Sequence, residues 1–104
     1  MIVQEITQKE YEEEIANKEE LYVLVFHATW CAPCKMFKIT LDELAKTNNI
    51  PVYRVDVDKY PELTRKFGVM SMPTWFILKN KEVVQEGLGY MPYPTFVKEV
   101  EKHL

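Results

Sequence analysis

An apolar segment that is followed directly by a helical pattern lies in the first third of this chain. Residues 21–35 read Leu-Tyr-Val-Leu-Val-Phe-His-Ala-Thr-Trp-Cys-Ala-Pro-Cys-Lys. The run Leu21–Phe26 is apolar without polar alternation, which predicts a central strand covered on both faces. From Pro33 to about Thr47, apolar residues recur at helical spacing. The only two cysteines of the chain, Cys31 and Cys34, fall at the junction of these two elements.

The rest of the chain alternates strand-like and helix-like segments. Strands are expected at residues 2–6, 52–57 and 74–78 and around 83–84, and helices after a capping box at Thr7, over 61–68 and from about Pro94. The order β-α-β-α-β-α-β-β-α predicts parallel pairing in the first half and an antiparallel hairpin near the end. The fold class is therefore α/β, with a mixed five-stranded sheet flanked by about four helices.

Composition limits the possible functions. A length of 104 residues predicts one domain over 1–104. A net charge of −3 argues against a nucleic-acid partner held through its phosphates, and three glycines argue against a glycine-rich phosphate loop. The longest apolar run is far short of the roughly 20 residues that span a bilayer, so no membrane contact is expected. No basic, apolar leader precedes the first strand, which predicts a cytoplasmic protein.

The spacing and setting of the two cysteines favour thiol–disulfide exchange. Residues three apart face the same side of a helix, so both sulfurs can meet at its first turn. The unpaired N–H groups and partial positive charge of a helix N-terminus stabilise a thiolate, and Pro33 is tolerated in a first turn. We expect Cys31, at the exposed edge, to attack a substrate disulfide and Cys34, one turn deeper, to resolve the mixed disulfide.

Two other interpretations of the cysteine pair are compatible with its spacing. The cysteines could be buried structural residues, or half of a tetrahedral zinc site completed by a second chain. No other cysteine exists, and His27 and His103 lack ligand spacing, so no metal site is predicted. Cytosolic cysteine pairs are more often catalytic or metal-binding than structural staples, which leaves exchange chemistry as the favoured interpretation.

Several segments, in order along nearly the whole chain, resemble thioredoxins. They are Val23–Met36, Val55–Asp58, Phe67–Val69, Met72–Thr74 and Gly87–Gly89. The resemblance implies the thioredoxin fold and a protein-disulfide reductase that serves cell redox homeostasis without a bound cofactor. It also implies disulfide-containing protein substrates, electrons from NADPH through a flavin thioredoxin reductase, and a monomeric state.

The resemblance also implies roles for individual residues. Pro73 matches the family's cis-proline, which lies opposite the cysteines and bars metal capture, and the Met72 backbone matches the position that pairs with a bound substrate strand. The apolar docking surface would comprise Trp30, Val69, Met70, Met72 and Gly89. Active-site support would come from Val25, His27, Trp30, Ala32, Pro33, Lys35 and Pro73. From the residues alone, Met70 and Met72 would be interpreted as core residues.

The chain departs from the family pattern at four positions near the cysteines. Val25 replaces a buried aspartate that helps to take the proton from the resolving cysteine, so slower deprotonation of Cys34 is expected. Arg54 replaces the lysine beside that aspartate, and we expect its guanidinium in solvent because burying it unpaired would be costly. Ala32 replaces a glycine and should alter the redox poise. His27 replaces an aromatic residue; it either packs as a ring or, as a cation, favours the Cys31 thiolate.

Two alternative functions remain compatible with this pattern. The changes at Val25 and His27 would suit a thioredoxin-like relative with an altered redox poise. The fold could also act as a protein-docking module that uses its surface for interaction.

Overall fold

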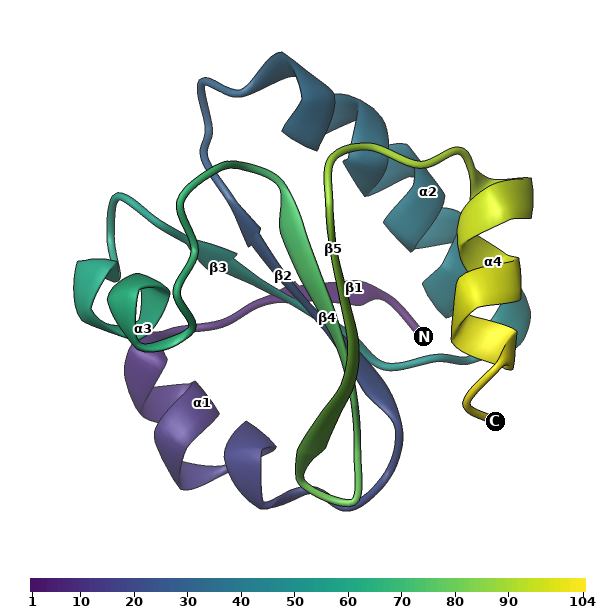
Figure 1. Cartoon of the computed structure of the whole chain (residues 1–104), viewed down its shortest axis with the longest axis horizontal. Helices are drawn as coiled ribbons and strands as arrows, with labels where there is room; N and C mark the ends of the chain where they lie inside the picture. The colour runs from purple at the N-terminus through teal and green to yellow at the C-terminus, as the bar shows by residue number, and fades with distance from the viewer.

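The computed structural model describes residues 1–104 and consists of a five-stranded sheet between two layers of helices (Figure 1). The strands are β1 (Val3–Glu5), β2 (Tyr22–His27), β3 (Val52–Asp56), β4 (Thr74–Lys79) and β5 (Glu82–Leu88). The helices are α1 (Gln8–Glu13), α2 (Ala32–Asn48), α3 (Pro61–Lys66) and α4 (Tyr93–Glu101), with a 3₁₀ turn at Ile15–Asn17. The predicted α/β fold and element order are confirmed.

The sheet is mixed, with β2 at its centre. The strand order is β1-β3-β2-β4-β5; β1, β3 and β2 are parallel, whereas β4 and β5 run antiparallel to their neighbours. Asn80 and Lys81 turn the final hairpin with φ of 55° and 69°, the left-handed conformation that a tight hairpin turn needs at both positions. The expected parallel half and antiparallel hairpin are both present.

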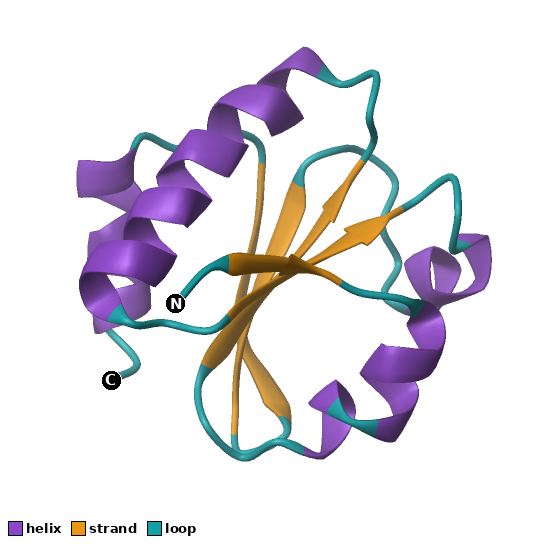
Figure 2. Ribbon diagram, turned by 180° about the vertical axis from the view of Figure 1, so that it is seen from behind, coloured by secondary structure: helices purple, strands orange, loops and turns teal.

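Each face of the sheet is covered by its own pair of helices. Helices α2 and α4 lie on one face and α1 and α3 on the other, as the views from both sides show (Figures 1 and 2). Because side chains alternate along a strand, Val23 and Val25 of β2 pack into the core under α2 and α4, whereas Leu24 and Phe26 pack into the opposite core. This two-sided burial explains why the run Leu21–Phe26 lacks polar alternation.

The helix ends follow local sequence rules. Thr7 and Glu10 form the expected capping box on α1, and α3 begins at Pro61. The long helix α2 is capped at its C-terminus by Asn49, which adopts a left-handed conformation with φ of 53°. None of the helices is long and apolar enough to cross a membrane.

Strand β5 passes very close to a buried tryptophan of β4. Trp75 is paired with Gly87 across the two strands, and its ring packs against Phe96 of α4 with ring centroids 5.0 Å apart. A Cβ atom placed on Gly87 would lie 2.2 Å from Cζ2 of Trp75. A glycine is therefore needed here because the indole occupies the space that a side chain would take.

We predict that Gly87→Ala lowers the free energy of unfolding by about 1–3 kcal/mol, the range for overpacking a filled core. Urea denaturation measures the loss. In a Trp75→Leu background the smaller side chain leaves room for the methyl group, so the additional cost of Gly87→Ala should fall close to zero. An equal cost in both backgrounds would show that the indole contact is not the cause.

Candidate active site

The two cysteines lie at the first turn of α2, directly after β2. Cys31 is the N-cap residue of α2, and its sulfur accepts a hydrogen bond from the backbone N–H of Cys34 at 3.2 Å. The Cα atoms of the two residues are 5.3 Å apart and their sulfurs are bonded as a disulfide. The helix start thus brings both sulfurs together. It also directs toward the Cys31 sulfur an N–H that has no partner within the helix.

Both cysteines are largely covered by neighbouring apolar residues. Cys31 is 5% exposed and Cys34 is 2% exposed. They pack with Ala28, and Val57 and Met72 lie against this small cluster. The expectation that Cys31 sits at an exposed edge is therefore wrong for the disulfide form, because the surrounding loops close over its sulfur.

Two further loops meet the cysteines from the opposite side. The Met72–Pro73 peptide bond is cis, and the carbonyl oxygen of Met72 lies 3.6 Å from the sulfur of Cys31. The carbonyl of Pro73 accepts a hydrogen bond from the N–H of Gly89 at 2.8 Å. Gly89 has φ of +87°, a conformation that favours glycine. The loop before β4 and the loop after β5 are in this way held together beside the disulfide.

Exposed apolar side chains surround the cysteines. Trp30 is exposed, and its indole Nε1–H donates to a carboxylate oxygen of Asp58 at 2.9 Å, which fixes the orientation of the ring. Met70 is 95% exposed, so the residue-based expectation that it is a core residue is wrong. Val69, Met72 and Gly89 are half-buried, whereas Ala32, Pro33 and Lys35 are exposed on the first turn of α2. The role of Asp58 in holding Trp30 was not foreseen.

A charged cluster lies beside this site on the ends of β1, β2 and β3. Glu5 accepts a hydrogen bond from Arg54 Nε at 2.5 Å and lies 2.9 Å from Nε2 of His27. The side chain of Arg54 is only 14% exposed. The expectation that Arg54 points into solvent is therefore wrong. Val25 on one neighbouring strand, β2, cannot pair with its charge, but Glu5 on the other neighbouring strand, β1, does.

His27 is buried, and its ring is not held by packing alone. Its Nε2 lies 2.9 Å from a carboxylate oxygen of Glu5, which gives the ring a polar partner. Although partial burial raises the pKa of Glu5, the hydrogen bonds from His27 and Arg54 outweigh this effect and hold that pKa below its ordinary value. Glu5 was missed because only the strand register, which pairs it with Arg54, reveals its partners.

The side chains around the site do not form a metal-binding cluster. No group of three or more histidine, cysteine or acidic side chains could hold a metal ion. A polar cavity of about 370 Å³ borders the charged cluster, and Glu5, His27 and Arg54 contribute to its walls. Mixed acidic and basic side chains line it, so it does not present a single charge to a ligand.

Comparison with known proteins places this geometry in a family. The Thioredoxin family model matches residues 2–102. The chain belongs to the thioredoxin family. It is 37% identical to thioredoxin from Listeria monocytogenes over 99% of this chain and all of that one, and 38% identical to thioredoxin from Bacillus subtilis over 85% and 86% of the two chains.

Solved structures of thioredoxins have the same fold as this chain. The crystal structure of a thioredoxin from Nicotiana alata superimposes with a TM-score of 0.87 at 27% identity, covering 97% of this chain and 91% of that one. Chloroplastic thioredoxin z gives a TM-score of 0.86 at 25% identity, covering 98% and 94%. As a member of the thioredoxin family with its cysteine pair in place, the protein is a thiol–disulfide oxidoreductase that reduces disulfides, and this family needs no bound cofactor.

We predict that the Glu5 cluster contributes stability that depends on pH. Because the folded-state pKa of Glu5 is lowered, this contribution is present above the unfolded pKa of about 4.3 and is lost as the pH falls through the folded value. Glu5→Gln should therefore be less stable than the wild type at neutral pH, and the difference should shrink in acid. Urea unfolding as a function of pH measures both effects.

The matched control is Glu13→Gln, which removes a carboxylate from the exposed surface of α1. Glu13→Gln should lose stability in acid to the same extent as the wild type, because it keeps the contacts of Glu5. A constant difference between wild type and Glu5→Gln across the acid range would show that the contacts of Glu5 with His27 and Arg54 do not depend on its charge.

Proposed function

We propose that Cys31 is the nucleophile and Cys34 the resolving thiol of a protein-disulfide reductase that works as a single-domain monomer in the cytoplasm. The observation that carries this assignment is the position of the Cys31 sulfur as the N-cap of α2, where it accepts the N–H of Cys34. A helix N-terminus favours negative charge, so after reduction this sulfur is the better placed of the two to be a thiolate.

In the first step the Cys31 thiolate attacks one sulfur of a substrate disulfide. The substrate S–S bond breaks, a bond forms between Cys31 and the attacked sulfur, and the other substrate sulfur leaves as a thiolate that takes up a proton. The N–H of Cys34 and the dipole of α2 stabilise the attacking charge until it passes to the leaving sulfur.

In the second step Cys34 releases the substrate. Its thiol loses a proton and attacks the sulfur of Cys31, the bond between Cys31 and the substrate breaks, and the second substrate thiolate is released and protonated. The Cys31–Cys34 disulfide forms, so two electrons pass from the protein to the substrate. Cys34 needs no access to the substrate for this step, which is consistent with its deep burial.

Substrate docking is proposed for the apolar surface around the cysteines. Trp30 and Met70 offer exposed apolar area, and Val69, Met72 and Gly89 are half-buried. The backbone of Met72, next to the Cys31 sulfur, would pair with the extended substrate chain, and Pro73 would keep metal ions from the thiolates. Ala32, Pro33 and Lys35 would shape the first turn of α2, with Val25 and His27 behind it.

The cycle requires a source of electrons and a compartment in which thiols persist. NADPH supplies the electrons in this proposal through a thioredoxin reductase, which returns the disulfide to the dithiol. The cytoplasm fits because its thiols are kept reduced. The pair of cysteines then alternates between two oxidation states instead of acting as a structural staple.

We predict different failures for the two cysteine variants. In an insulin-reduction assay with dithiothreitol, Cys31→Ser should give no more activity than the reductant alone, because the attacking sulfur is absent. When Cys34→Ser is first reduced, then freed of dithiothreitol and mixed with insulin, it should form the first mixed disulfide and keep it, so a covalent adduct should accumulate on non-reducing gels. An adduct on Cys31→Ser instead, through Cys34, would reverse the proposed roles.

The same assay separates the chemistry from the electron source. The wild type should also reduce insulin when NADPH and a bacterial thioredoxin reductase replace dithiothreitol. If the protein is active with dithiothreitol but not with NADPH and the reductase, the disulfide-reductase assignment stands and thioredoxin reductase is not its electron donor. Partner binding that survives in Cys31→Ser without any reduction would favour a docking role.

We predict that Val25→Asp accelerates turnover near neutral pH. A buried carboxylate has a raised pKa and can accept the proton of Cys34. The buried, apolar side chain of Val25 cannot accept a proton. The change should also lower stability by about 1–3 kcal/mol, because it places a polar group in the core. Val25→Asn is the matched control, since it has nearly the same shape but does not titrate. A rate that is unchanged or slower in Val25→Asp would contradict the prediction.

A further inference from the structure

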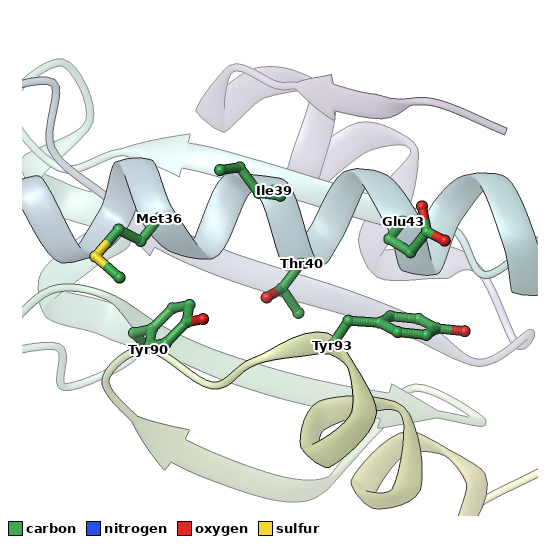
Figure 3. Close-up of a pocket in the computed structure, with 6 residues that line it drawn as sticks. All are labelled: Met36, Ile39, Thr40, Glu43, Tyr90 and Tyr93. Atoms are coloured by element: carbon green, nitrogen blue, oxygen red, sulfur yellow. The ribbon is translucent and has the colours of Figure 1, made fainter.

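An apolar groove lies along α2 from Met36 to Glu43, between this helix and the start of α4. Its volume is about 290 Å³, at the small end of ligand pockets, which suits a single side chain better than a cofactor. Four of its six lining residues are apolar or aromatic. Helix α2 contributes one side, and the loop after β5 with the first residue of α4 contributes the other (Figure 3). The lining residues are Met36, Ile39, Thr40, Glu43, Tyr90 and Tyr93.

The walls of this groove are held by hydrogen bonds between its two sides. The hydroxyl of Thr40 donates to the carbonyl of Met91 at 2.7 Å, which ties α2 to the loop after β5. The hydroxyl of Tyr93 donates to the side-chain oxygen of Asn48 at 2.8 Å and lays the ring along the helix. A groove fixed before binding loses less entropy when it is filled.

Two residues at one end of the groove adjoin active-site segments in the chain. Met36 is two residues after Cys34 on α2, and Tyr90 follows Gly89, whose N–H is bound to Pro73 beside the disulfide. Ile39 lies nearly one turn beyond Met36 and is exposed. This end of the groove is therefore next in the chain to both the cysteine helix turn and the loop that is bound to Pro73.

The far end of the groove carries an unpaired negative charge. Glu43 is exposed, accepts a hydrogen bond only from the hydroxyl of Thr47 at 3.1 Å, and forms no salt bridge. Figure 3 places it next to the Tyr93 ring. A cationic side chain emerging from the apolar part of the groove would meet this carboxylate.

We propose that this groove binds the substrate segment that flanks the reacting cysteine, taking one aromatic or large aliphatic side chain with a lysine or arginine beyond it. This inference rests on the proposed function and names the substrate feature that the site selects. On α2, Ile39 lies about 12 Å and Glu43 about 18 Å beyond Cys31 at a rise of about 1.5 Å per residue. An extended chain covers these spans in roughly four and six residues.

The test uses synthetic peptides with a central cysteine that is joined by a disulfide to 5-thio-2-nitrobenzoate. The Cys31 thiolate attacks the peptide sulfur, the peptide–nitrobenzoate S–S bond breaks, and the coloured thiolate leaves. One phenylalanine is placed in turn at each position up to about six residues on either side of the cysteine, in an otherwise alanine- and serine-based peptide. The second-order rate constant is compared with that of the peptide without phenylalanine.

At one or two adjacent positions, phenylalanine should raise the rate constant about tenfold, equivalent to about 1.4 kcal/mol. Ile39→Glu should abolish this preference, because it places a charge in the apolar wall. The matched control is Ile2→Glu: Ile2 is 78% exposed and Ile39 73%, and Ile2 precedes β1 at the sheet end opposite to the cysteines. Ile2→Glu should keep the preference.

A second set of peptides tests the charge at the far end. With phenylalanine at its best position, an arginine one to three residues beyond it should raise the rate constant a further two- to fivefold, roughly the effect of an exposed ion pair. Glu43→Gln should remove the gain from arginine while the gain from phenylalanine persists. An arginine effect that is the same in Glu43→Gln would overturn this part of the proposal.

The possible failures are distinguishable. Absence of any phenylalanine preference in the wild type, or a preference that survives in Ile39→Glu, would overturn the groove proposal while the reductase assignment stands. If the wild type fails to react with the plain peptide, the proposed function itself fails. If sedimentation shows a dimer that Ile39→Glu dissociates, the groove binds a second copy of this chain, and the substrate proposal is wrong.

Discussion

The hydrogen bond from the Cys34 N–H to the Cys31 sulfur joins the fold of this protein to its chemistry. It exists because β2 ends directly at the start of α2, so that the first orphan N–H groups of a long helix point at the N-cap side chain. The core holds this junction rigidly, since β2 is buried along its whole length and α2 packs on the sheet through Phe37, Leu41 and Leu44. A sulfur at this position caps the helix, and the helix N-terminus in turn stabilises the thiolate form of that sulfur.

The rest of the site is assembled around that junction from distant parts of the chain. The loop before β4 brings the Met72 carbonyl to the Cys31 sulfur, and the loop after β5 is bound to Pro73 through Gly89. Trp30 is exposed, yet its indole is held by Asp58. Exposed apolar groups are therefore displayed on segments that are themselves fixed by hydrogen bonds, a combination suited to recognising extended polypeptide.

The charged cluster illustrates how one substitution is compensated elsewhere. An apolar Val25 leaves Arg54 on the neighbouring strand without a carboxylate beside it, and an unpaired guanidinium at this depth would be costly. Glu5 reaches across from β1 and contacts both Arg54 and His27. The charges next to the active site thus remain balanced, although the carboxylate comes from a different strand and lies at a different place.

Local patterns in the amino-acid sequence were enough to predict the element order, the capping box at Thr7, the strand–helix junction and the meeting of Cys31 with Cys34, because each depends on residues within a few positions of one another. The pairing of Glu5 with Arg54, the approach of Gly87 to Trp75, the covering of Cys31 and the groove between α2 and α4 followed only from the tertiary structure. These contacts join residues that are at least 12 positions apart in the chain, beyond the reach of local patterns. Strand register selects the first two: a shift by one residue would turn Glu5 to the other face of the sheet.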